Sequence, residues 1–274
     1  MKLESSLKKI VLFILLFLLF VGVDYEFEAM SGLAVSSQQF FAVILAASLL
    51  LIYVIPFVGL LIFLYKRWQQ PLYILPLTFF TGYFSTGWLA GEGNDWLGKK
   101  IMTLFGSKSP VMAWLDALTA PVVEEFIKLI CVLLLVYLLN ADNLKLYFLI
   151  GACVGLGFQL CEDVSYIFNI AAEHMNEIVP QAFNRLSGSL TSHWLYTAIF
   201  SVGVGSLKSK QLSKKATLVC LSAPILLHFL WNSPLNVSYF VSACLSSISA
   251  YLLLKLLPLL DKPDKPATKI DHCV

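Results

Sequence analysis

Several charged and ionisable side chains of this sequence occur inside segments that are otherwise apolar. The set comprises Glu124, Glu125, Lys128, Glu162, Asp163, His193 and His228. Carboxylates and imidazoles are the groups with which proteins activate water as general acids and bases or hold a metal ion. A charge at the centre of a bilayer is unfavourable by about 2.5–3.5 kcal/mol, so charges kept in apolar segments indicate a functional site. The chemistry to expect is hydrolysis, metal binding or proton transfer.

The spacing of these residues predicts their local geometry. Lys128 lies four residues after Glu124 and three after Glu125, so on a helix one lysine can neutralise either glutamate. His228 and Asn232 likewise share a helical face. Glu124 with Lys128 alone is equally consistent with a structural ion pair, and a single histidine near a membrane surface is usually interfacial. Their combination on four apolar segments favours a shared site.

The composition places these residues in a membrane protein. The chain has 274 residues, of which 58% are hydrophobic and 13% charged, and its mean hydropathy is +0.80. Such a sequence is far more apolar than a soluble domain. The formal net charge of +2 gives no basic balance that would indicate nucleic acid, so the expected surroundings are the lipid bilayer. The six cysteines include no C-x-x-C pair, and five of them fall in apolar segments as packing residues.

The apolar segments predict the fold class. A membrane-spanning helix needs about 20 mostly apolar residues. The segments expected to span are 9–23, 41–65, 71–90, 118–139, 146–169, 189–207, 216–232 and 237–257. The predicted fold is therefore all-α, a polytopic membrane helix bundle with about eight transmembrane helices. We expect one transmembrane domain over 1–260, with its catalytic core at about 118–232, and a polar cytoplasmic tail over 261–274. The segments expected to be loops are 24–40, 91–117, 170–188 and 233–236.

Basic residues predict the orientation, because lysine and arginine are enriched in cytoplasmic loops. They precede the first predicted span and follow the second, fourth, sixth and eighth. Both termini are therefore expected to be cytoplasmic, with Lys99, Lys100 and Lys108 in the outer 91–117 segment as the exception. With this orientation and a rise of about 1.5 Å per residue, the ionisable groups of spans four to seven converge on one layer near the outer face.

Four sequence elements in these spans resemble those of a known family. They are Glu124-Glu125-x-x-Lys128, Gly157-Phe158-x-x-x-Glu162-Asp163-x-x-Tyr166, His193 with Thr197 and Gly203, and His228-x-x-Trp231-Asn232. Together they resemble the PrsW family of intramembrane proteases and, more distantly, the CAAX-prenyl-protease and bacteriocin-immunity superfamily. Asp163 departs from the family pattern, which usually has asparagine at this position.

The resemblance implies an intramembrane endopeptidase of the bacterial cytoplasmic membrane that cuts membrane-anchored proteins, with anti-sigma factors as the best-known substrate class. The candidate catalytic residues are Glu124, Glu125, Lys128, Glu162, His193, His228 and Asn232. Among them, Asn232 is a candidate hydrogen-bond donor to the oxyanion that develops during peptide hydrolysis.

Two mechanisms are consistent with these residues. In a metal-dependent version, His193, His228 and Glu162 form a site for Zn²⁺, and Glu124 or Glu125 acts as the general base. In a metal-free version, a glutamate of the pair and a histidine polarise the water directly. The metal-free version is favoured, because the motif is not H-E-x-x-H and a lysine beside a metal ion is unfavourable.

Two other functions use the same residues. A proton- or ion-coupled transporter could employ the carboxylates and histidines as a relay. Transporters usually contain paired halves with broken helices in corresponding positions, and this sequence has no such pairing. A catalytically inactive scaffold is disfavoured because all four elements are retained. The sequence therefore predicts an intramembrane protease.

Overall fold

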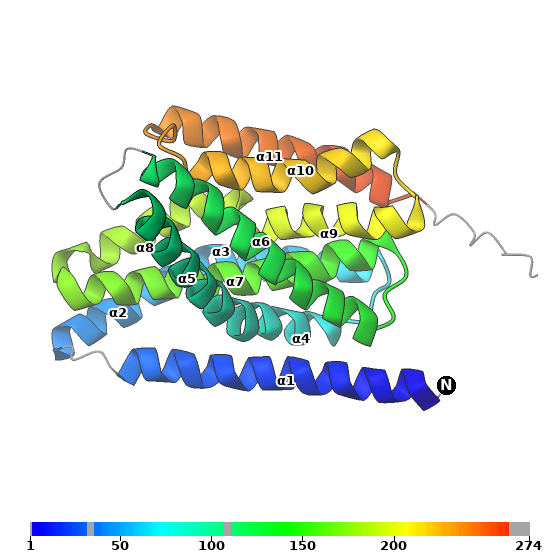
Figure 1. Cartoon of the computed structure of the whole chain (residues 1–274), viewed down its shortest axis with the longest axis horizontal. Coiled ribbons are helices and arrows are strands. Elements are labelled where there is room, and N and C mark those ends of the chain that lie inside the picture. Colours follow the sequence, from blue (N-terminus) through cyan, green and yellow to red (C-terminus); the bar gives the residue numbers. More distant parts are fainter. Residues whose placement is uncertain (1, 32–35, 107–110, 263–274) are drawn as a thin grey trace, which may run out of the picture.

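The protein is a bundle of helices. The computed structural model describes residues 2–31, 36–106 and 111–262, and these form helices and turns without a strand. Figure 1 shows the longer helices running side by side along an elongated bundle. The longer helices are α1 (Lys2–Ser31), α2 (Ser37–Leu49), α3 (Leu51–Arg67), α5 (Gly87–Phe105), α6 (Met112–Leu138), α7 (Leu144–Glu173), α9 (His193–Ser209), α10 (Lys214–Asn232) and α11 (Tyr239–Leu260). The shorter elements are α4 (Ile74–Phe80), η1 (Thr81–Thr86), η2 (Met175–Glu177), α8 (Ile178–Gly188) and η3 (Ser189–Thr191).

The predicted all-α membrane fold is confirmed. In the described part of the chain, the segments long and apolar enough to cross a bilayer are Glu4–Ser31, Ser37–Arg67, Leu144–Ala171, Lys214–Asn232 and Tyr239–Leu260. They make the chain an integral membrane protein. The three other predicted spans fall on α4, η1 and the start of α5, on α6, which carries the paired glutamates and a lysine, and on α9, which has 17 residues.

Helix α7 lies at the centre of the bundle, and every residue from 146 to 159 is buried. A helix that is apolar on all sides is expected in such a position. Glycines set its distance from α9: a Cβ atom added at Gly155 would lie 2.4 Å from the carbonyl oxygen of His193, and one at Gly151 would lie 2.8 Å from that of Thr197. The two backbones can approach this closely only because no side chain intervenes.

The predicted loop over 91–117 is wrong where the structure describes it. Helix α5 continues to Phe105 and α6 begins at Met112, while residues 107–110, with Lys108, lie outside the described part. Gly93 allows α5 to pack closely on α6, because a Cβ at this position would lie 2.8 Å from the Val123 side chain. Sequence polarity here marks one exposed helical face and not a loop.

Helix α5 is joined to α4 by a π-helical turn, η1, without a break in the helical path. In this turn the backbone hydrogen bonds connect residues five apart, so it contains more residues than an α-helical turn. Gly82 in η1 packs directly on α7, since a Cβ there would lie 2.2 Å from the carbonyl oxygen of Val154.

Two other predicted loops contain helix. Helix α1 continues through the first part of 24–40 as far as Ser31, and its Glu26 is buried, where Cys161 Sγ donates a hydrogen bond to it. The segment 170–188 contains the end of α7 and the amphipathic helix α8. Both segments were predicted to be loops because they contain many polar residues, most of which in the structure lie on the exposed faces of helices. Of the predicted tail over 261–274, Asp261 and Lys262 are described and the rest lies outside the described residues.

One end of the bundle collects the basic residues. The beginning of α1 and the end of α11 lie at this end (Figure 1). Lys8 donates a hydrogen bond to Asn140, and Arg67 forms an ion pair with Asp261 over 2.8 Å. We refer to it below as the basic end.

Candidate active site

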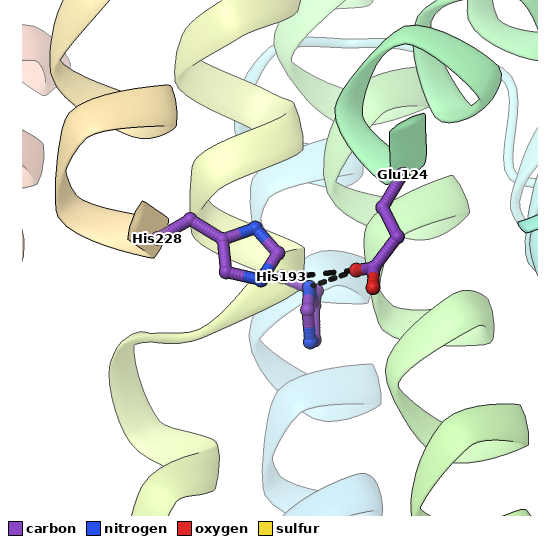
Figure 2. Close-up of side chains that lie close together, drawn as sticks. All are labelled: Glu124, His193 and His228. Carbon is purple, nitrogen blue, oxygen red and sulfur yellow. Dashed lines mark ion pairs between the residues drawn. The ribbon is translucent and has the colours of Figure 1, made fainter. Parts of the chain in front are cut away.

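Helices α6, α9 and α10 bring one glutamate and two histidines together (Figure 2). Glu124 Oε2 lies 3.8 Å from His193 Nδ1 and 3.7 Å from His228 Nε2. The two imidazole rings are 4.8 Å apart between centroids. His228 follows the first residue of α10, Lys214, by 14 positions, which places it about 20 Å from the basic end at 1.5 Å per residue.

Glu125 lies beneath this group and is completely buried. Its Oε1 accepts a hydrogen bond from Lys128 Nζ at 2.6 Å and lies 3.2 Å from His228 Nδ1, while its Oε2 accepts one from Thr197 at 3.1 Å. A carboxylate can only accept, so His228 Nδ1 carries the proton in that contact. In the neutral form of the ring, Nε2 then presents its lone pair towards Glu124.

Glu162 on α7 orients the other histidine. Its Oε2 lies 3.1 Å from His193 Nε2, which must carry the proton in this contact. The lone pair of His193 Nδ1 then faces Glu124, and Lys128 Nζ lies 3.0 Å from the same atom. Both histidines thus have one nitrogen fixed by a carboxylate and the other directed at Glu124.

An arginine that the sequence analysis did not identify belongs to this cluster. Arg185 on α8 forms ion pairs with Glu162 and, through Nε at 2.5 Å, with Asp163. Asp163 also accepts a hydrogen bond at 2.8 Å from the hydroxyl of Tyr53 on α3. Two signals could have found Arg185: it is the only basic residue in 170–188 apart from His174, and a second acid beside Glu162 needs a cation.

Asn94 on α5 was also missed, because its segment was expected to be a loop. Its side-chain amide donates a hydrogen bond to Glu124 Oε1 at 3.2 Å. Glu124 Oε2 is buried and forms no hydrogen bond among the described residues, although Lys128 Nζ lies 3.8 Å from it. One oxygen of Glu124 is therefore held in place while the other is free to bind.

A cavity of about 890 Å³ opens onto the cluster. Glu124, Glu162, His193, His228 and Asn232 all contribute to its wall. Glu125 and Lys128 do not line it. The predicted site residues thus divide into a layer that faces the cavity and a fully buried pair that supports this layer.

The donor set fits a metal ion. The ligand atoms of Glu124, His193 and His228 lie within 4.8 Å of one another, and the described residues contain no other such group. With neutral histidines, the four carboxylates Glu124, Glu125, Glu162 and Asp163 outnumber the cations Lys128 and Arg185 by two charges, which a divalent ion would balance. The ligand set predicted from the sequence contained Glu162, whereas in the structure Glu162 contacts the far nitrogen of His193.

Buried carboxylates and histidines on membrane helices, open to one cavity, are the arrangement that a membrane-embedded hydrolase requires. A family model described as PrsW family intramembrane metalloprotease matches residues 70–259, and the chain belongs to this family. It is therefore an intramembrane protease, as the four sequence elements indicated. Neither a curated protein nor a solved structure matches the chain. The distant relation to the CAAX-protease superfamily stays a prediction.

Proposed function

We propose that this protein is a zinc-dependent endopeptidase that hydrolyses peptide bonds in membrane-anchored proteins of the anti-sigma-factor kind. The observation that carries the proposal is the buried Oε2 of Glu124, which forms no hydrogen bond among the described residues and faces nitrogens of His193 and His228 at 3.8 and 3.7 Å. The family description as a metalloprotease supports the metal-dependent mechanism over the metal-free one favoured by the sequence.

Glu124, His193 and His228 would hold the ion. A bound zinc ion supplies Lewis acidity and lowers the pKa of a water molecule towards neutrality. Lys128 Nζ already contacts His193 Nδ1, so ion binding requires this ammonium group to rely on Glu125 instead. Glu125 then has two functions: it neutralises Lys128 and fixes the ring of His228.

Glu162 is proposed as the general base. Its side chain is 21% exposed and lines the cavity, whereas Glu125 is inaccessible. Both contacts of Glu162 involve Oε2, which leaves Oε1 able to accept a proton from the attacking water and return it to the leaving amine. Asn232, exposed on the cavity wall one turn beyond His228, is proposed to donate to the developing oxyanion.

The proposed location is the bacterial cytoplasmic membrane, with both termini cytoplasmic. Basic residues are enriched on the cytoplasmic side of membrane proteins, and here they collect at the basic end. The cavity then lies towards the outer face, where it would receive the membrane-proximal part of a single-span substrate.

The test is cleavage of a single-span reporter protein co-expressed with the chain. The variants are Glu124→Gln, Glu125→Gln, His193→Ala and His228→Ala, with Glu28→Gln, an exposed glutamate on α1, as the matched control. We expect cleavage to fall at least 100-fold in the four site variants at equal membrane abundance, and to be unchanged in the control. Undiminished cleavage in all four would overturn the proposal.

The metal is tested on purified protein. A chelator should abolish reporter cleavage, and added zinc should restore it. If chelation leaves cleavage intact while Glu124→Gln remains inactive, the metal-free mechanism is correct and the zinc assignment fails.

A further inference from the structure

Two charged residues of the site, Asp163 and Arg185, take no part in the proposed reaction. Asp163 is 1% exposed, and Arg185 approaches it from α8 with its Nε atom at 2.5 Å. Neither residue belongs to the candidate metal site of Glu124, His193 and His228. A buried aspartate and a partly buried arginine are nevertheless unfavourable to retain beside a membrane, so they require an explanation.

Their contacts form one continuous chain across four helices, α3, α7, α8 and α9. The hydroxyl of Tyr53 donates to Asp163, Asp163 accepts from Arg185, Arg185 also donates to Glu162, and Glu162 accepts from His193 Nε2. The guanidinium carbon of Arg185 lies 4.4 Å from the centre of the Tyr166 ring, which fixes its plane. A planar guanidinium with several donors can bridge two carboxylates in this way, whereas an ammonium group has no such fixed fork.

This chain of contacts ends at His193, whose Nδ1 atom must face Glu124 if both residues are to bind the same ion. Glu162 can aim His193 only if the carboxylate itself cannot turn, and Arg185 is its one cationic partner among the described residues. Adding Asp163 and Arg185 together leaves the net charge of the cluster at two negative charges, because the two cancel. The pair therefore adds rigidity without altering the charge that balances a divalent ion.

We propose that Arg185, anchored by Asp163, is a positioning residue that holds Glu162 against His193 and thereby directs His193 Nδ1 at Glu124. The inference rests on the proposed metal site. It also gives a physical reason for the aspartate at position 163, where the sequence departs from the family pattern: this acid fixes the arginine.

The test compares Arg185→Met with Asp163→Asn and the double variant in the full-length purified protein. For Arg185→Met we expect kcat and zinc affinity each to fall about 10- to 100-fold with KM nearly unchanged, as for other partners of metal-binding histidines. The double variant should recover part of this loss, because a neutral amide at position 163 leaves no buried charge without a partner. Zinc affinity is measured by competition with a fluorescent chelator, which does not depend on cleavage.

Arg67→Met is the matched control, because Arg67 binds Asp261 through the same two kinds of guanidinium nitrogen at the basic end. It should leave kcat and zinc affinity unchanged. If folded Arg185→Met protein keeps the wild-type kcat and zinc affinity, Arg185 only ties α8 to α7 and the inference is overturned. If the wild-type protein binds no zinc at all, the proposed metal site is wrong. This result differs from failure of the Arg185 inference, in which the wild-type protein and Arg185→Met bind zinc equally well.

Discussion

Two arginines of this protein form ion pairs with aspartates in very different surroundings. At the basic end, the side chains of Arg67 and Asp261 are 51% and 36% exposed. In the site, those of Arg185 and Asp163 are 23% and 2% exposed. Water competes with the first pair and screens it, whereas the second pair must satisfy itself from the protein alone. The same kind of ion pair therefore has different consequences for stability at the two places.

Two lysine–carboxylate ion pairs show the same contrast between an exposed and a buried pair. Lys99 pairs with Asp95 on α5 with exposed fractions of 74% and 62%, while Lys128 and Glu125 on α6 are both completely buried. Each pair joins residues one helical turn apart. The sequence spacing of an ion pair thus indicates that it can form, and burial decides what its loss would do.

The largest effect is expected from Lys128→Met. Removing this ammonium leaves Glu125 buried with its charge uncompensated, which typically lowers the free energy of unfolding by about 3–5 kcal/mol. The change should appear in unfolding titrations with a denaturing detergent, and reporter cleavage should fall as well. Combining Lys128→Met with Glu125→Gln should recover part of the stability. Unchanged stability and turnover in the single variant would contradict the role of Lys128.

A smaller effect is expected from Gly155→Ala. The added Cβ would lie 2.4 Å from the carbonyl oxygen of His193, and backbone on both sides cannot yield easily. Overpacking of this kind costs about 1–3 kcal/mol, measured by the same titration. Gly98→Ala is the control, because no atom lies within 4 Å of a Cβ at this position. Equal stability of the two variants would show that α7 and α9 can separate without loss.

The smallest effect is expected from Arg67→Met. Hydrogen bonds from Arg67 and Trp68 lower the pKa of Asp261. A lowered folded-state pKa stabilises the protein above the usual carboxyl pKa of about 4, and this stabilisation is lost as the pH falls through the lowered value. The unfolding midpoint of Arg67→Met should therefore differ little from wild type at pH 7 and not at all in strong acid. A large loss of stability at pH 7 would contradict the view that the exposed pair of Arg67 and Asp261 contributes little.

The sequence was sufficient for the parts of the molecule that obey one strong rule. Long apolar segments predicted the membrane helices, and charges within them predicted that Glu124, Glu125, His193 and His228 would meet. Segments with mixed polarity were read incorrectly. Helices α5 and α8 carry Asn94 and Arg185 into the site, and both were expected to be loops because their exposed faces are polar.

The sequence could not predict which of the two adjacent glutamates faces the cavity and which is buried against Lys128. Glu124 and Glu125 are adjacent, and either can reach Lys128 by spacing alone. Adjacent residues on a helix point about 100° apart, so only the packing of the neighbouring helices decides which one faces the cavity. In this fold α9 supplies Thr197 to Glu125, and α5 supplies Asn94 to Glu124.

The π-helical turn η1 gives the chain a rotational offset. Each residue added to a helix turns everything beyond it by about 100°, so the wider turn at Thr81–Thr86 sets the direction in which α5 faces. Asn94 lies two turns further on and meets Glu124 at that phase. Deleting one residue from η1 would rotate the amide away from the carboxylate without touching any residue of the cluster. The number of residues in η1 thus determines whether the Asn94 amide points at Glu124.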